Sequence, residues 1–168
     1  MKIVRAMVLS VLVISLPAIA APAHQHGSAK IDISVEGNKF TIGLEMPLDS
    51  TIGSERPART DKEKLAYASM MAALKNPAGL FTPTAAANCR VESFQVSDPF
   101  PGGKPKPDGH ADIDAEYLLI CANPAALKGF ETTLFKQFKR LQKIDVQRTT
   151  PSGQGKMTMT PGQASAAW

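Results

Sequence analysis

The sequence has few of the residues that nucleic-acid binding and the common catalytic sites require. Only 6% of its 168 residues are aromatic, which leaves little surface for base stacking. The formal net charge is only +4, too small to indicate a nucleic-acid or anionic-membrane partner. The sequence contains no Gly-rich phosphate loop, no G-x-S-x-G elbow and no H-E-x-x-H motif. These absences favour a protein that is not an enzyme.

The sequence also lacks an apolar run long enough to cross a membrane. Its most apolar stretch, Met7 to Leu16, is bracketed by Arg5 and Pro17, whereas a spanning helix needs about 18 or more apolar residues. This stretch fits the apolar region of a secretory signal peptide that is cleaved after Ala20, with cleavage after Ala23 as the alternative. A lipoprotein would need a cysteine directly after the cleavage point, and the first cysteine of this sequence is Cys89. We therefore expect a periplasmic protein with no membrane insertion after cleavage.

Cysteine is scarce as well, with Cys89 and Cys121 as the only two. In an oxidising compartment they are expected to form a disulfide, which would stabilise the fold by roughly 3–4 kcal/mol for a loop of about 32 residues. The alternatives are a cysteine nucleophile or a pair of thiolate ligands for zinc. Neither the spacing nor the flanking residues resemble a zinc ribbon.

Hydrophobic alternation predicts a β-hairpin near the N-terminus of the mature chain. Apolar and polar residues alternate from Ala29 to Glu36 and again from Phe40 to Leu44, on either side of a Gly37–Asn38 turn. A helix is expected next, because Thr60 and Glu63 form a capping box and Asn76-Pro77 ends the helical pattern. Its apolar stripe is predicted to consist of Leu65, Ala68, Met71, Ala72 and Leu74.

The second half of the chain is predicted to be mostly strands. Strands are expected over residues 91–96, 110–121, 144–148 and 156–160, a Pro/Gly-rich loop over 98–109, and helical spacing over 125–141. An antiparallel pair that begins at Cys89 and ends at Cys121 would bring the two sulfurs together. In the strand 110–121, one face is apolar and is predicted to point to the core: Ala111, Ile113, Ala115, Tyr117, Leu119 and Cys121.

These elements together predict the α+β class. We expect an antiparallel sheet with an N-terminal β-hairpin, two helical segments on one face, and one disulfide. In terms of domains, residues 1–20 are a signal peptide, residues 21–160 are a single domain, and residues 161–168 are a C-terminal tail.

The three histidines are the residues most suggestive of function. His24 and His26 stand two apart in an extended segment, where both imidazoles can reach one ion. His110 opens a strand whose outer face also carries Asp112, Asp114 and Glu116, spaced about 7 Å apart along the strand. Imidazole with carboxylate suits zinc, and also copper or nickel. The alternative interpretation is a flexible tail and the solvated side of a sheet.

The order and spacing of short motifs over nearly the whole mature chain resemble those of the ZrgA-type proteins. These small periplasmic proteins of Gram-negative bacteria were long catalogued as a domain of unknown function. The motifs that carry the resemblance are His24-Gln25-His26-Gly27, Glu36-Gly37-Asn38, Leu44-Glu45-Met46-Pro47, Pro57-Ala58-Arg59-Thr60, Leu80-Phe81, Asn88-Cys89, His110-Ala111-Asp112, Glu116-Tyr117, Cys121, Leu134-Phe135 and the segment from Leu141 to Gln147.

The resemblance implies zinc binding in the periplasm, without catalysis, in support of zinc uptake by an ABC importer. It points to His24, His26 and His110 as zinc ligands, with Glu55 or Asp112 as an oxygen ligand and a zinc-importer component as the partner. Arg56, which stands where the family tends to have histidine, would disturb such a site unless it paired with Glu55.

Two departures from the family pattern leave a second hypothesis open. The loop 98–109 holds no histidine, although the family usually has a His-rich tract there, and Arg56 replaces a histidine. The alternative is therefore a metal-independent periplasmic module that binds a protein partner. Its surface would consist of apolar and basic groups such as Phe100, Lys104 and Lys106.

Overall fold

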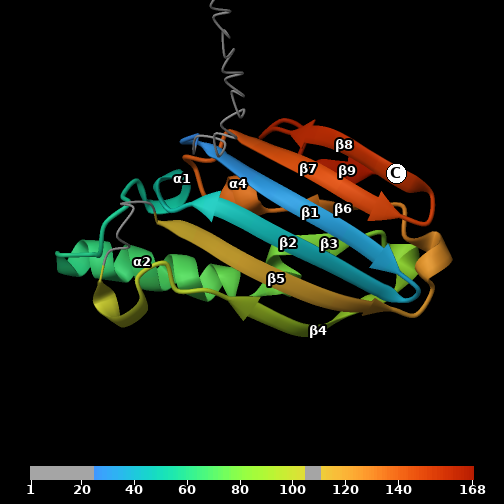
Figure 1. Cartoon of the computed structure of the whole chain (residues 1–168), viewed down its shortest axis with the longest axis horizontal. Coiled ribbons are helices and arrows are strands. Elements are labelled where there is room, and N and C mark those ends of the chain that lie inside the picture. Colours follow the sequence, from blue (N-terminus) through green and yellow to red (C-terminus); the bar gives the residue numbers. More distant parts are fainter. Residues whose placement is uncertain (1–24, 105–110) are drawn as a thin grey trace, which may run out of the picture.

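The computed structural model, which describes residues 25–104 and 111–168, contains a six-stranded sheet backed by a smaller sheet and short helices (Figure 1). The strands are β1 (Ser28–Glu36), β2 (Lys39–Pro47), β3 (Phe81–Pro83), β4 (Cys89–Val96), β5 (Asp112–Cys121), β6 (Gly129–Thr132), β7 (Lys143–Thr150), β8 (Gly153–Met159) and β9 (Ser165–Ala167). The α-helices are α1 (Asp49–Ile52), α2 (Asp61–Leu74), α3 (Pro77–Leu80) and α4 (Leu134–Gln137).

The predicted N-terminal hairpin is confirmed as β1 and β2. The two strands pair antiparallel from Lys30–Glu45 to Glu36–Lys39, and Gly37 in the turn has a φ of 60°, which favours glycine. Every second residue of β1 is buried and the residues between them face outward, as the alternation predicted.

The hairpin lies in the middle of the main sheet, whose strand order is β4-β5-β2-β1-β7-β8. All neighbouring strands run antiparallel except β1 and β7, which are parallel. The expected α+β class and mostly antiparallel sheet are confirmed, whereas the parallel pair was not predicted. Periodicity within one strand says nothing about the direction of a neighbour that is more than 100 residues away in the sequence.

The core lies between the inner face of this sheet and the helices and small sheet behind it. The inner face of β5 is the one that the sequence predicted, since all six of the expected residues are buried. The Tyr117 hydroxyl donates a hydrogen bond of 3.0 Å to the Leu74 carbonyl of α2, and the Tyr117 ring packs on Phe81 with 5.2 Å between ring centroids. A buried phenol thus joins the sheet to its helical layer without leaving a polar group unpaired.

The predicted disulfide between Cys89 and Cys121 is also confirmed. These residues are directly paired where β4 begins and β5 ends. The bond therefore ties the edge strand β4 to the interior of the sheet.

Helix α2 begins as predicted, but only part of its predicted apolar stripe is buried. The Thr60 and Glu63 capping box is present. The expected apolar stripe is confirmed at Leu74, which is buried, and at Met71, which packs half-buried against the core. It is wrong at Leu65, Ala68 and Ala72, which are exposed, with Leu65 at 69%, and Met70 is buried instead. The first half of α2 extends beyond the edge of the sheet in Figure 1, so Leu65 has little to pack against.

The helical segment expected over residues 125–141 is wrong for most of its length. Only α4 is α-helical there, after a 3₁₀ turn at Pro124–Ala126 and strand β6, which lies between β3 and β9 in the small sheet. A Cβ on Gly129 would lie 2.2 Å from the Ala166 carbonyl oxygen, so this close strand pairing requires glycine. The aromatic residues with helical spacing are buried from different elements.

The C-terminal residues belong to the fold, in contrast to the expected tail at 161–168. Strand β9 pairs with β6, and the Trp168 amide donates a hydrogen bond of 3.0 Å to the Lys128 carbonyl. The three-residue β9 gave too short a pattern for sequence analysis to detect.

Several expectations concern residues outside the described part of the chain. These are the signal peptide, cleavage at Ala20 or Ala23, His24, Lys106 and His110. The described part of loop 98–109 is irregular, with a 3₁₀ turn at Pro101–Gly103. Within residues 25–104 and 111–168, no helix has the length and apolar character needed to cross a membrane.

We predict that removing the disulfide destabilises the fold without changing it. The double variant Cys89→Ser/Cys121→Ser should lose about 3–4 kcal/mol of unfolding free energy, because the bond closes a 32-residue separation and restricts the unfolded chain. Denaturant unfolding of both proteins, with and without reductant, measures this. Reductant should not affect the double variant, and equal stability of the unchanged protein and the variant in the absence of reductant would contradict the prediction.

Candidate functional site

The segment that leads into β1 is anchored at one end of the main sheet. The Gly27 amide donates to the Ser50 hydroxyl over 3.0 Å, and that hydroxyl donates to the Ser28 carbonyl over 3.1 Å. Ser50 is fully buried, and the Gln142 amide donates to the Gly27 carbonyl over 2.8 Å. The turn that carries His26 is therefore held from both sides.

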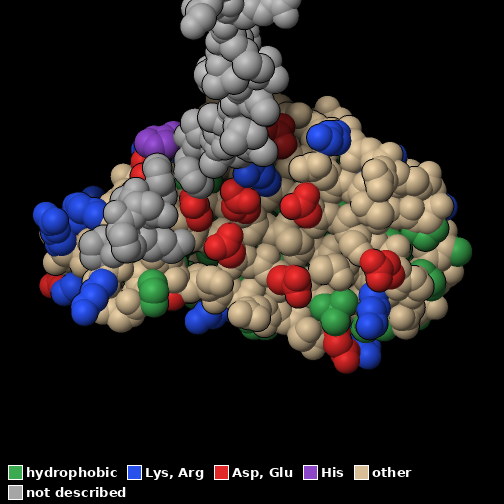
Figure 2. Space-filling view, in the orientation of Figure 1, with side chains coloured by type: hydrophobic (Ala, Val, Ile, Leu, Met, Phe, Trp, Pro, Cys, Tyr) green, Lys and Arg blue, Asp and Glu red, His purple; other side chains and the backbone are tan. Residues whose placement is uncertain are grey.

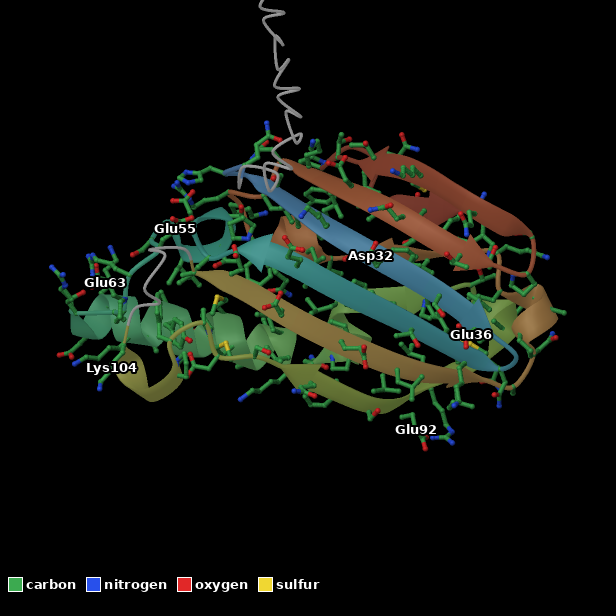
Figure 3. All side chains as sticks on the ribbon, viewed as in Figure 1. Asp32, Glu36, Glu55, Glu63, Glu92 and Lys104 are labelled. Carbon is green, nitrogen blue, oxygen red and sulfur yellow. A yellow bond between two sulfur atoms is a disulfide. The ribbon has the colours of Figure 1, made fainter. Side chains whose placement is uncertain are left out.

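The His26 imidazole lies between two carboxylates. Its Nδ1 is 3.4 Å from Asp49 Oδ2, and its Nε2 is 3.6 Å from Glu55 Oε1. The His26 side chain is 65% exposed, whereas those of Asp49 and Glu55 are 13% and 25% exposed. Figure 3 shows Glu55 beside α1, at the end of the sheet where β1 begins. One solvent-accessible imidazole thus contacts two carboxylates that are more buried than itself.

Asp49 and Glu55 are positioned by α1 and the turn that ends it. Gly53 caps α1 in the left-handed conformation, with φ 76°, which reverses the chain and brings Glu55 back toward His26. Arg140 covers this turn: its Nε donates to the Asp49 carbonyl over 2.9 Å, and its Nη2 is 3.3 Å from each Asp49 carboxylate oxygen. A Cβ on Gly53 would lie 3.1 Å from Arg140 Nε, so glycine also leaves room for the arginine.

Arg56, which the sequence analysis considered as a partner of Glu55, does not pair with it. Its Nη2 is instead 2.5 Å from Glu63 Oε1 at the start of α2. The Arg56 guanidinium, together with the Thr60 and Arg59 amides, lowers the pKa of Glu63 to about 2. The arginine is therefore held by Glu63, and Glu55 remains available to His26.

The arrangement of these side chains resembles part of a metal site. A carboxylate on one imidazole nitrogen commonly orients a metal-binding histidine, whose other nitrogen then faces the ion. Asp49 and Glu55 take up the two sides of the His26 ring, so the three side chains do not converge on one point. Among the described residues, no group of three or more His, Cys, Asp or Glu side chains is arranged to hold a metal ion.

Of the other predicted ligands, Asp112 is the one that the structure describes. It opens β5 opposite Pro47, and the Leu48 amide donates to the Ala111 carbonyl over 2.7 Å. The start of β5 thus lies next to the residue that precedes Asp49. His24 and His110, which directly precede Gln25 and Ala111 in the chain, lie outside the described residues.

The surface proposed for the alternative hypothesis is not formed as expected. Phe100 is buried, at 5% exposure, and packs against Tyr67 with 6.2 Å between ring centroids. Lys104 is exposed, and Lys106 lies outside the described residues. Phe100 is therefore a core residue and not part of a binding surface.

Asp49 is the site residue that sequence reasoning missed, although a signal for it was present. The hairpin pairs Lys30 with Glu45. Continuing that pairing away from the turn puts residue 28 opposite residue 47 after two residues and residue 26 opposite residue 49 after four. The predicted hairpin therefore already contained the proximity of His26 and Asp49.

The chain is thus an α+β domain in which a histidine lies between two carboxylates at one end of the main sheet. A family model described as ZrgA family zinc uptake protein matches residues 23–168, and the chain belongs to that family. A comparison with curated proteins gave no match.

We predict that the ionised Glu63 carboxylate stabilises the fold, and that this stabilisation is lost when the carboxylate is protonated at low pH. Because its folded pKa lies below the usual value, this contribution is complete above about pH 4.5 and is lost as the pH falls toward 2. The unfolding temperature of Glu63→Gln should therefore be lower than that of the unchanged protein near pH 6, and this difference should become smaller by pH 2.

The matched control is Glu131→Gln on β6, since the exposed Glu131 carboxylate forms no ion pair with another described residue. Its unfolding temperature should stay close to that of the unchanged protein at both pH values. A Glu63→Gln deficit that is the same at pH 6 and pH 2 would contradict the assigned role of the carboxylate.

Proposed function

We propose that the protein binds zinc in the periplasm and supports zinc uptake as a non-catalytic accessory protein. The observation that carries this proposal is the position of His26 between Asp49 and Glu55, in a chain of the zinc uptake family. Zinc is the bound cargo in this proposal, and no chemical step is assigned to it.

The spacing of His26 and Glu55 suits two ligands of one zinc ion. Zinc–nitrogen and zinc–oxygen bonds are about 2.0–2.2 Å long, so two ligand atoms of a tetrahedral ion lie about 3.3–3.6 Å apart. His26 Nε2 and Glu55 Oε1 are 3.6 Å apart. Only small movements of the two side chains are required for both to contact one ion.

Asp49 has a different role in the proposed site. Its carboxylate lies on the Nδ1 side of His26 and is itself held by Arg140. In that place it orients the imidazole and favours the tautomer with Nδ1 protonated, which directs Nε2 toward the ion. Arg140 balances the charge of Asp49, so the negative charge of Glu55 is the one that faces the cation.

The remaining ligands of a four-coordinate ion come from water or from residues outside the described part of the chain. His24 and His110 are the sequence-based candidates, because they are covalent neighbours of Gln25 and Ala111 at this end of the sheet. A site built on an imidazole that is 65% exposed is suited to receiving and passing on an ion, as uptake requires.

The experiment is a zinc titration of the metal-stripped mature protein by calorimetry at neutral pH. His26→Ala should abolish the tight site, and Glu55→Gln should weaken it. Asp49→Asn should weaken it about 10- to 100-fold, as is typical when the group that orients a metal ligand is changed. Glu92→Gln, on β4 and far from this end of the sheet in Figure 3, is the control with unchanged affinity.

His24→Ala and His110→Ala, measured in the same way, identify the remaining ligands. Loss of affinity in either variant assigns that histidine to the site, and unchanged affinity in both leaves water as the remaining ligand. If the unchanged protein bound zinc no more tightly than His26→Ala, the zinc proposal would be wrong.

The alternative from the sequence is a metal-independent module that binds a protein partner. One observation favours it: the described residues bring a single histidine, with its two carboxylates, to this end of the sheet. Partner binding that is indifferent to chelators would support this second function.

A further inference from the structure

The outer face of the main sheet is acidic and is not covered by any other element of the described residues. The helices and the small sheet lie on the opposite face (Figure 1), and acidic side chains gather over the central strands of the outer one (Figure 2). The carboxylates on the outer side of β1, β2 and β5 are Asp32, Glu36, Glu45, Asp112, Asp114 and Glu116. Since the whole chain has a net charge of +4, this face opposes the average charge of the protein.

Two of the cations on this face form ion pairs, whereas the exposed Lys39 on β2 and Lys156 on β8 form none with another described residue. Lys30 Nζ is 2.8 Å from Glu45, and Lys143 Nζ is 2.8 Å from Asp145. The hydrogen bond to Glu45, and then the charges of Glu45, Asp112 and Asp32, raise the pKa of Lys30. By contrast, the exposed side chains of Asp32, Asp114 and Glu116 form no ion pair with any other described residue.

A hollow of about 370 Å³ lies between these carboxylates. It is lined from β1, β2, β5 and the edge of β4, and Asp32, Glu116 and Gln95 are among its polar lining residues. Figure 3 shows Asp32 on β1 near the centre of this face. The floor of the hollow is Gly43, which pairs with Asp32 on one side and with Glu116 on the other.

The fold itself does not require glycine at position 43. A Cβ there would meet Asp32 atoms at 3.8 Å, an ordinary contact, and Gly43 does not have a positive φ. A glycine in a central strand weakens the sheet and commonly marks a place where another molecule approaches closely. The hollow therefore leaves room for another molecule to approach the sheet closely, beside the charge of the face.

We propose that this outer face is a docking surface for a basic segment of a protein partner, with one Lys or Arg side chain of that segment seated over Gly43 between Asp32 and Glu116. These two residues are separated by two strand spacings, about 10 Å between Cα atoms. A long cationic side chain that enters between them can contact both carboxylates, while Gln95 offers an amide at the edge. Asp114, on the same face of β5, extends the negative surface along the strand for the rest of the segment.

The docking surface is separate from the proposed zinc site. His26 and Glu55 precede β1 and follow α1, whereas Gly43 lies within β2 and its neighbours lie within β1 and β5. Substitutions on one can therefore be tested without altering the other, and failure of one proposal leaves the other standing.

The test is an amide-resolved NMR titration of the mature protein with a blocked Gly-Arg-Gly-Arg-Gly peptide and with its uncharged citrulline analogue. The arginine peptide should shift the amides of β1, β2 and β5 around Gly43, and the citrulline peptide should not. Raising the salt from about 50 to about 300 mM should weaken binding, because exposed charge pairs are screened.

Two kinds of variant separate shape from charge. Gly43→Val should weaken peptide binding about tenfold or more by filling the hollow, while its unfolding temperature stays equal or rises, because a β-branched residue suits a strand. Asp32→Asn and Glu116→Gln should each weaken binding about two- to fivefold, as expected for exposed ion pairs. Glu131→Gln, on the small sheet, and His26→Ala should leave peptide binding unchanged.

Several outcomes would overturn the proposal. Equal binding of the two peptides, shifts that map to another surface, or a Gly43→Val variant that binds as well as the unchanged protein would each do so. If zinc, titrated in place of the peptide, shifted the Asp32 and Glu116 signals, the face would be a cation site instead. Self-association that Gly43→Val abolishes would make the occupant a second copy of this chain.

Discussion

The antiparallel pairing of β1 with β2 is the constraint on which the rest of the structure depends. These two strands are the centre of the main sheet: β5 builds outward from β2, and β7 builds outward from β1. A slip of one residue in their register would turn every buried side chain of one strand to solvent. Both functional regions follow from this register, because it places His26 near Asp49 at the end of the hairpin and Asp32 beside Gly43 in its middle.

Structural stability and the candidate zinc site are linked through the end of the sheet. Buried Ser50 joins α1 to the start of β1, and Arg140 joins α1 to the segment before β7. Side chains from three distant parts of the sequence thus hold the turn that carries His26. Such support suits a ligand whose direction must be maintained while the imidazole itself stays accessible.

The two faces of the main sheet have divided roles. The inner face is filled with apolar side chains and Tyr117, and it gives the domain its core. The outer face keeps acidic groups and a glycine where β-branched or aromatic residues would stabilise the strands better. An accessory protein in metal uptake needs both a place for the ion and a surface for another component, and the chain has a candidate for each in separate positions.

The sequence alone determined the elements whose patterns are local. The hairpin, the capping box at Thr60 and Glu63, the inner face of β5 and the Cys89–Cys121 pair follow from alternation, capping chemistry and export, and the structure has all of them. The position of His26 beside Glu55 was anticipated only through the family resemblance, and Asp49 was overlooked although the hairpin register contained it.

Only the tertiary structure decided the features that depend on distant partners. The burial of Met70 in place of Leu65 depends on which part of α2 reaches the sheet, and β6 is a strand because β3 and β9 pair with it on both sides. Arg56 turns to Glu63 because the chain reverses at Gly53 before α2 begins. In each case the local pattern allowed two outcomes, and contacts between segments far apart in sequence selected one of them.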